Sequence, residues 1–371
     1  MLEFAPQSPV KQRGPSVLNY LLIYCRAGFE SEAASEIATR AAELGFFGYP
    51  NFSPNSAYVL YHLTGEQNAL ELMEQLKFRR LIFARQWVAC TDLLSHVSTK
   101  DRITPLLAAA EGLPQSAELY VETADTTDGR NLNGFARKFG SALSGAMRQA
   151  GLMLPRKQRA DWRTHLFVID GQTFWLGVSP IKNSCRWEQG ILRLKFPPSA
   201  PSRSTLKLEE AWHWFVPKAD WQEKIESGRT AVDLGAAPGG WTWQLVNRNM
   251  FVTAVDNGPM SQELMDSGQV DHRREDAFTF KPNKPVDMLV CDVVEKPSQV
   301  TELMAKWAIN RWSTILIFNL KLPMKQRFAE VESCLEQLQS ILTEAQLRYK
   351  LEAKHLYHDR EEITVYLELS R

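Results

Sequence analysis

Four short and almost entirely apolar runs alternate with helical stretches in the second half of the chain, and this alternation constrains the fold more than any other feature. The runs cover residues 230–234, 251–255, 288–291 and 313–320. Strands that are apolar on both faces are typical of parallel sheets covered by helices on either side. The sequence therefore predicts an α/β domain with a doubly wound sheet, whose ligand binds at the carboxyl ends of the strands.

The first half of the chain predicts smaller α+β units. Apolar periodicity indicates strands at 17–25, 57–63, 81–90 and 117–123, helices at 30–44, 67–75 and 132–151, and a hairpin formed by 165–169 and 173–178. Prolines and serines then interrupt all regular structure between 196 and 205. We therefore expect a flexible leader at 1–17, an α+β domain at 18–100, a second domain at 101–190, a linker at 191–205 and the α/β domain at 206–371.

Composition restricts the cellular compartment and the binding partners less sharply than the apolar runs restrict the fold. Lys plus Arg and Asp plus Glu both total 43, so information about partners must come from local charge. The five cysteines are odd in number and contain no Cys-x-x-Cys pair, which favours a reducing cytoplasm. No apolar run approaches the ~18 residues of a membrane span. His355 and His358 lie near Asp359 without a third ligand at metal spacing, so we expect no metal. The oligomeric state stays open.

A glycine-rich turn follows the first of the four apolar runs. Residues 230–242 read Thr-Ala-Val-Asp-Leu-Gly-Ala-Ala-Pro-Gly-Gly-Trp-Thr. Glycines at 235, 239 and 240 let a ligand approach the backbone, and the following helix start offers amide donors to a carboxylate. Asp256, which ends the second run, stands where such folds bind ribose hydroxyls. The spacing predicts an adenosine-type ligand. A nicotinamide-dependent dehydrogenase is the generic alternative for a doubly wound domain, but the turn is not Gly-x-Gly-x-x-Gly, which weakens that alternative.

Residues 233–241 resemble the first motif of S-adenosylmethionine-dependent methyltransferases of the RNA ribose 2′-O type. The resemblance implies a Rossmann-like methyltransferase domain with S-adenosylmethionine as its cofactor. Carried over position by position, it implies the following cofactor-binding residues: Ser204, Gly235, Ala237, Pro238, Gly239, Gly240, Asp256, Asp276 and Asp292.

Two lysines and two acids stand near the ends of predicted strands and at the start of a helix. Removing a proton from a ribose hydroxyl needs a neutral lysine, and burial beside a second cation lowers a lysine pKa towards ~7–8. An adjacent carboxylate would raise that pKa, but it can still orient the lysine by hydrogen bonding. Lys207, Asp292, Lys321 and Glu362 resemble the Lys-Asp-Lys-Glu tetrad of the same enzymes. The resemblance implies that Lys321 is the general base, that Asp292 orients it, and that Lys207 and Glu362 position the ribose. Glu361 is the alternative fourth member.

A strongly basic segment lies between residues 130 and 163, with eight basic residues against one acid. Segregated positive charge of this kind is what phosphate binding requires. A solvated helix face is the alternative for this cluster. We expect RNA to contact Arg137, Lys138, Arg148, Arg156, Lys157, Arg159 and Arg163. The basic track is expected to continue through Arg186, Arg193, Lys195, Arg203 and Lys207.

Nearly the whole chain resembles the bacterial large-subunit ribosomal RNA methyltransferase M family. Residues 21–34, the basic segment and the hairpin through Val178 resemble a ferredoxin-like domain followed by a THUMP RNA-binding domain. The resemblance implies cytoplasmic 2′-O-methylation of the cytidine at position 2498 of 23S rRNA, in naked or early precursor RNA. Other rRNA or tRNA nucleotides, and a non-enzymatic RNA-binding assembly factor, are the alternatives.

Overall fold

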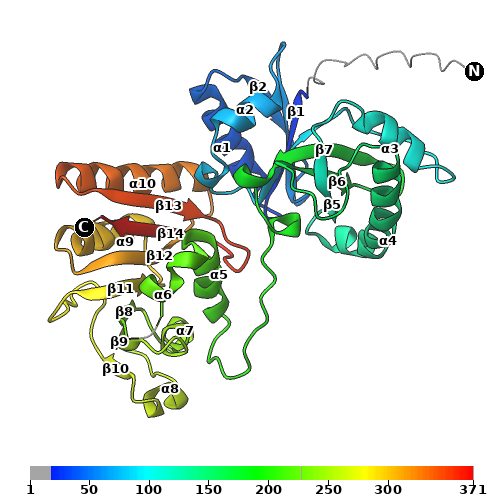
Figure 1. The fold of residues 1–371 in the computed structure, drawn as a ribbon. Helices are drawn as coiled ribbons and strands as arrows, with labels where there is room; N and C mark the ends of the chain where they lie inside the picture. The colour runs from blue at the N-terminus through cyan, green and yellow to red at the C-terminus, as the bar shows by residue number, and fades with distance from the viewer. Residues whose placement is uncertain (1–17, 227, 371) are drawn as a thin grey trace, which may run out of the picture. The chain divides into compact units, whose positions relative to one another are not determined.

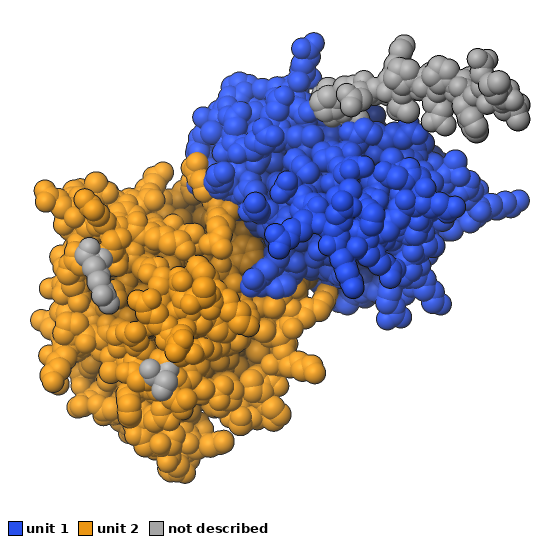
Figure 2. All heavy atoms as spheres, viewed as in Figure 1, with its two compact units in different colours: residues 1–78, 86–190 blue, residues 79–85, 191–371 orange. Residues whose placement is uncertain are grey.

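The computed structural model of the protein describes residues 18–226 and 228–370, so the leader expected at 1–17 lies outside the described residues. Two compact units make up the chain, and Figure 2 colours them separately. Unit 1 comprises residues 1–78 and 86–190, and unit 2 comprises residues 79–85 and 191–371. Within the described ranges, no helix is both long enough and apolar enough to span a bilayer.

A seven-stranded sheet with the order β2-β3-β1-β4-β7-β6-β5 forms unit 1 (Figure 1). Its first four strands are antiparallel, and the chain order β1-α1-β2-β3-α2-β4 is that of a ferredoxin-like fold. The strands are β1 (Tyr20–Tyr24), β2 (Gly48–Asn51), β3 (Tyr58–Leu63), β4 (Gln86–Cys90), β5 (Ser116–Thr123), β6 (Trp162–Val168) and β7 (Phe174–Pro180). The helices are α1 (Glu30–Glu43), α2 (Ala69–Gln75), α3 (Ile103–Ala110) and α4 (Thr127–Gln149).

This sheet curls strongly rather than lying flat. Three strands separate β1 from β5, which at about 4.8 Å per strand would place them too far apart for side-chain contact. The Tyr24 hydroxyl nevertheless donates to Glu122 Oε2 at 2.8 Å. Tyr24 also packs with Phe167 and Trp175 in one buried cluster. The concave face of the curled sheet is therefore an internal core of unit 1.

Unit 2 contains a second seven-stranded sheet, with the order β10-β9-β8-β11-β12-β14-β13. Figure 1 shows these strands one below another from β13 to β10. The pairs from β10 to β12 are parallel, whereas β14 runs antiparallel to β12 and β13. The strands are β8 (Thr230–Leu234), β9 (Phe251–Val255), β10 (Val270–Arg273), β11 (Val286–Cys291), β12 (Ser313–Lys321), β13 (Tyr349–Lys354) and β14 (Glu362–Leu369).

Helices cover both faces of the unit 2 sheet. Apolar side chains of α5, α6 and α7 pack with Met288, Val290 and Ile317 in one buried cluster. Strand residues alternate between faces, so Leu289 and Leu316 point to the other side, where α9 packs against β12. The helices are α5 (Thr205–Phe215), α6 (Trp221–Lys224), α7 (Gly240–Val246), α8 (Gln262–Asp266), α9 (Pro297–Ile309) and α10 (Arg327–Glu344).

The structure also contains elements that apolar periodicity did not predict. Strands β2, β10 and β13 and helices α3, α6 and α8 are additions, and β2 carries the poor strand formers Gly48 and Pro50. The strand expected at 81–90 begins only at Gln86, because residues 79–85 pack in unit 2. Between Ile191 and Ser204, where we expected a linker, there is neither helix nor strand.

Candidate active site

The glycine-rich turn between β8 and α7 has a backbone that only glycine fits at three positions. Gly235 and Gly239 have φ of +78° and +115°, a region that favours glycine. A Cβ on Gly235 would lie 2.9 Å from Val293 Cγ1, and one on Gly240 would overlap Ser204 Oγ. The turn therefore keeps bare backbone at the carboxyl end of β8.

Three other residues expected to bind the cofactor have different surroundings. The Asp256 carboxylate accepts hydrogen bonds from the amides of Ala237, at 3.0 Å, and Gly258, at 2.7 Å, so it lies against the glycine-rich turn. Ser204 also lies at the turn, beside Gly240. Asp276 is exposed in the loop after β10, where its carboxylate accepts from the Phe278 amide at 2.8 Å.

Asp233 is a functional candidate that the sequence analysis missed. It lies within β8, two residues before Gly235, and is 1% exposed. Thr242 Oγ1 donates to Asp233 Oδ2 at 2.6 Å, while Oδ1 has no hydrogen-bond partner among the described residues. Burial, followed by the charges of Asp292 and Asp256, raises the pKa of Asp233 to about 7. An acid within an otherwise apolar strand is the signal that could have identified it.

Two amines and two carboxylates meet at the carboxyl edge of the unit 2 sheet. Lys321 ends β12, Asp292 follows β11, and Lys207 lies on α5. Asp292 Oδ1 accepts from Lys321 Nζ at 2.9 Å and Asp292 Oδ2 accepts from Lys207 Nζ at 3.1 Å. Glu362 forms ion pairs with both lysines. The four groups thus alternate in sign around a closed, charge-balanced ring, which we call the tetrad.

The antiparallel direction of β14 brings Glu362 into the tetrad. Glu362 is the first residue of β14 and pairs in register with Lys321, the last residue of β12. A parallel strand would have placed its first residue at the opposite edge of the sheet. The neighbouring Glu361 is exposed and accepts instead from Arg327 Nη2 at 3.0 Å. The structure therefore places Glu362, and not Glu361, beside the two lysines.

Charge balance within the tetrad controls its protonation. Burial opposes ionisation of Asp292, but Lys207 and Lys321 outweigh it and lower the pKa of Asp292. Burial likewise favours a neutral Lys321, but Asp292 and Glu362 outweigh it and raise the pKa of Lys321. Of the two opposing effects expected from the sequence, the raising effect of adjacent carboxylates therefore outweighs burial, because two carboxylates contact Lys321 directly.

Three family models match consecutive parts of the chain. They are the RlmM ferredoxin-like domain over residues 18–88, the N-terminal region of ribosomal RNA large subunit methyltransferase M over 101–180, and the FtsJ-like methyltransferase over 200–352. The ferredoxin-like and methyltransferase folds expected from the sequence are thereby confirmed. The THUMP fold expected within 101–190 stays a prediction.

Relatives of known description match almost the whole chain. The ribosomal RNA large subunit methyltransferase M of Cellvibrio japonicus (strain Ueda107) is 49% identical over 94% of this chain and 99% of its own. Proteins with the same name from Tolumonas auensis and Aliivibrio salmonicida are 48% and 46% identical, over 94% and 95% of this chain and 96% and 98% of their own. This chain belongs to the ribosomal RNA large subunit methyltransferase M family.

Membership of the methyltransferase M family makes the chain a methyltransferase enzyme. It excludes the nicotinamide-dependent dehydrogenase and the non-enzymatic assembly factor that the sequence left as alternatives. Among solved structures, TrmN from Thermus thermophilus matches 95% of this chain and 99% of its own at 14% identity and a TM-score of 0.34, which is too low to carry an argument.

The basic segment of this methyltransferase M chain divides into exposed and internally bonded residues. Arg148 Nη2 donates to the Ala117 carbonyl at 3.1 Å. Arg163 is 3% exposed, and its guanidinium donates to Glu118 Oε2 at 3.0 Å and to the Cys185 carbonyl at 2.9 Å. These two arginines are thus engaged within unit 1. Five of the seven expected RNA-binding residues are exposed, namely Arg137, Lys138, Arg156, Lys157 and Arg159.

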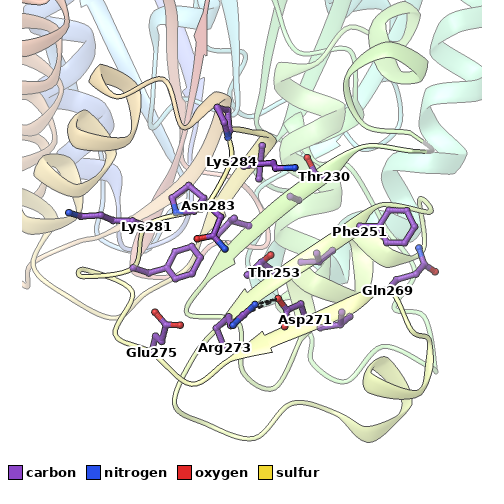
Figure 3. A pocket seen from close by; sticks show the side chains of 18 of the residues that line it. Thr230, Phe251, Thr253, Gln269, Asp271, Arg273, Glu275, Lys281, Asn283 and Lys284 are labelled. Carbon is purple, nitrogen blue, oxygen red and sulfur yellow. Dashed lines mark hydrogen bonds and ion pairs between the residues drawn. The ribbon is translucent and has the colours of Figure 1, made fainter.

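A cavity of about 590 Å³ lies elsewhere in the methyltransferase half and does not contain the tetrad. Figure 3 shows its lining, which includes Thr230 and Phe251 at the starts of β8 and β9, together with Arg273, Lys281 and Lys284. The tetrad and the glycine-rich turn lie where strands β8, β11 and β12 end. The described part of the chain contains no group of three or more His, Cys, Asp or Glu residues that could hold a metal ion.

Proposed function

We propose that this enzyme transfers a methyl group from S-adenosylmethionine to the ribose 2′-oxygen of a cytidine in 23S rRNA. The observation that carries the proposal is the tetrad, which lies at the same sheet edge as the glycine-rich turn. The resemblance to the methyltransferase M family suggests the details of the substrate. The target would be the cytidine at position 2498, methylated in naked or early precursor RNA in the cytoplasm.

The residues at the glycine-rich turn fit the cofactor. The turn offers backbone that a Cβ would obstruct, and Asp233 Oδ1 provides a buried acceptor without a partner among the described residues. When bound, S-adenosylmethionine supplies an activated methyl group on a sulfonium, whose positive charge opposes protonation of nearby amines. The residues that would hold it are Ser204, Gly235, Ala237, Pro238, Gly239, Gly240, Asp256, Asp276 and Asp292.

Lys321 is the proposed general base. Its Nζ would take the proton of the ribose 2′-hydroxyl, which would make the hydroxyl oxygen a better nucleophile. Asp292 holds Nζ in place through the 2.9 Å hydrogen bond to Oδ1. Lys207 and Glu362 complete the ring and position the ribose. Aligning the attacking oxygen with the methyl group is the larger part of the task, because the methyl group is already activated.

RNA binding is proposed for the exposed part of the basic segment. Arg137 and Lys138 project from α4, and Arg156, Lys157 and Arg159 lie in the loop between α4 and β6. Cations in such numbers release condensed counterions from phosphates, which supplies affinity without sequence selectivity. Arg148 and Arg163, whose guanidiniums have partners within unit 1, serve the fold instead.

The decisive test is the substitution Lys321→Ala in a single-turnover methylation assay. A general base contributes about 10²–10⁴-fold to a rate, so we expect a loss of at least about 100-fold. Calorimetry should show that S-adenosylhomocysteine binds this variant as it binds the wild type. Lys325→Ala, in the exposed stretch after β12, is the matched control and should keep the wild-type rate. Wild-type turnover by the Lys321 variant would refute the base assignment.

Mapping of ribose methylation identifies the target nucleotide. RNA from cells that contain the protein is compared with RNA from cells that lack it. Loss of one methyl group at the proposed cytidine is the expected result. Loss of a methyl group at a different rRNA or tRNA nucleotide would support the proposed methyl transfer but show that the target nucleotide is a different one.

A further inference from the structure

A chain of buried polar side chains lies behind the tetrad. Asn319 Nδ2 donates to Asp292 Oδ1 at 2.9 Å. Thr364 Oγ1 lies 2.8 Å from Asn319 Oδ1, and 3.2 and 3.0 Å from the two carboxyl oxygens of Asp359. Asn319, Thr364 and Asp359 are all 0% exposed. The chain therefore links a buried acid to the tetrad carboxylate through two side chains that water does not reach.

Counting protons along this chain fixes the direction of its hydrogen bonds. Asn319 directs its amide nitrogen to Asp292, so its carbonyl oxygen can only accept. Thr364 has a single hydroxyl proton, which it must give to Asn319 Oδ1 if that buried acceptor is to be satisfied. The remaining contact, between Thr364 Oγ1 and Asp359, then requires a proton from Asp359.

The surroundings of Asp359 favour that protonated form. Burial raises the pKa of Asp359, and the charges of Glu362 on β14 and Glu210 on α5 raise it further, while Lys207 on α5 lowers it. Glu210 accepts from the amides of Tyr357 and His358 and from His358 Nδ1. The Leu356 amide donates to Asp359 Oδ2 at 3.0 Å. His355 Nε2 bonds to the Arg360 carbonyl at 3.0 Å.

We propose that protonated Asp359, Thr364 and Asn319 form a one-way hydrogen-bond chain that holds the Asp292 carboxylate towards Lys321. Asp359 donates to Thr364, Thr364 donates to Asn319, and Asn319 donates to Asp292. The three are positioning residues, because none of them contacts the reacting atoms. The inference rests on the proposed role of Lys321 as base.

Two pairs of substitutions test this chain in the full-length protein. Asp359→Asn offers an amide donor to Thr364 and so mimics the protonated acid, whereas Asp359→Leu has similar size and no donor. Thr364→Ser keeps the hydroxyl and Thr364→Val removes it at nearly constant shape. We expect Asp359→Asn and Thr364→Ser to retain turnover. The other two should lower kcat up to about 100-fold, the cost of misplacing a reacting group by about 1 Å, with KM for RNA unchanged.

A stability measurement reads the protonation state without any turnover. A carboxyl group whose pKa is raised on folding costs stability as pH rises above its unfolded value of about 3.9. Asp359→Asn abolishes that cost, so its stability relative to wild type should increase from pH 4 to pH 7 in urea unfolding. This result stands even if the proposed substrate is wrong, which separates failure of the two proposals.

The opposite results for the Asp359 variants would contradict the proposed hydrogen-bond chain. An ionised Asp359 would accept from Thr364, and Asp359→Asn would then impair kcat as much as Asp359→Leu does and gain no stability with pH. If Asp359→Leu does not fold, the Thr364→Ser and Thr364→Val pair still decides: equal rates in that pair would show that the hydroxyl transmits nothing to Asp292.

Discussion

At the scale of single residues, the tetrad is balanced in charge, and this balance governs how Lys321 can act. Two carboxylates raise the pKa of Lys321, so the amine is protonated at neutral pH in the free protein. The role of general base that we propose for Lys321 requires a neutral amine, so in that role Lys321 has to lose a proton before the transfer. The rate of methyl transfer is therefore expected to rise with pH above neutrality.

Removing one carboxylate tests this dependence. Glu362→Gln takes away one of the two charges that raise the pKa of Lys321, so the pH profile of the single-turnover rate should shift to lower pH. The maximal rate should fall, because Glu362 also bonds Lys207. Glu361→Gln is the control: its side chain pairs with Arg327 and the profile should not move. A shift to higher pH in the Glu362 variant would contradict this account of Lys321.

At the scale of elements, the turn between β8 and α7 depends on the absence of side chains. Gly239 combines a positive φ with close packing against Leu264, and Gly240 lies against Ser204. Both contacts join the turn to segments distant in sequence. Sequence spacing identified these glycines, but the reason that a side chain does not fit at them is tertiary packing.

Gly240→Ala should therefore lower both thermal stability and affinity for S-adenosylhomocysteine. The added Cβ overlaps Ser204 Oγ, and overpacking of this kind costs about 1–3 kcal/mol. Gly134→Ala, within α4, is a matched control, since its Cβ would meet nothing within 4 Å. Alanine favours helix over glycine by about 0.8–1.0 kcal/mol, so the control should melt at the same or a higher temperature. Calorimetry and thermal unfolding measure both effects. Equal melting temperatures and equal affinities for the two variants would contradict the steric argument.

At the scale of the whole molecule, the methyltransferase unit includes a segment from the first half of the sequence. Residues 79–85 belong to unit 2, where the Leu81 carbonyl accepts from buried Lys354 Nζ at 2.6 Å and the Ile82 carbonyl accepts from the His355 amide at 2.9 Å. Phe83 is fully buried beside Phe328 and His355. A fragment of residues 191–371 alone would lack these partners.

Phe83→Ala should destabilise the full-length protein by about 3–5 kcal/mol, the usual range for a buried Phe→Ala cavity. Phe251→Ala is the control, because Phe251 is 58% exposed and should change stability little. Urea unfolding followed by a signal from unit 2 measures the difference. A similar loss in the two variants would show that the 79–85 segment does not stabilise the unit. The fragment 191–371 should unfold at a lower urea concentration than the intact chain.

Charge reversal tests the proposed RNA surface at the same scale. Changing Arg156, Lys157 and Arg159 to Glu should weaken RNA binding and flatten its salt dependence, because fewer counterions are released. Lys77, Lys100 and Lys284 are exposed basic residues outside the 130–163 segment. Reversing these three changes the net charge equally and should leave the salt slope nearer to wild type. Filter binding over a range of salt concentrations measures the salt slope of each triple variant. Equal slopes for the two variants would show that RNA does not bind at Arg156, Lys157 and Arg159.

Sequence alone determined the features that are local or periodic. Apolar runs fixed the bounds of β8 and β9, and the glycine spacing identified the turn, because burial on both faces and positive φ each leave a mark on composition. Short strands with few apolar residues, such as β10, left no such mark. The residue types at 207, 292, 321 and 362 were readable from the sequence, and family resemblance suggested that they meet.

Only the tertiary structure decided how distant residues combine. It selected Glu362 over Glu361 through the antiparallel register of β14, and it decided the direction of the pKa shift of Lys321 by bringing two carboxylates into contact. It placed 79–85 in the methyltransferase unit and Asp359 behind the tetrad. These outcomes depend on distances between segments far apart in the chain. Such distances follow from packing, and no local pattern of residues records them.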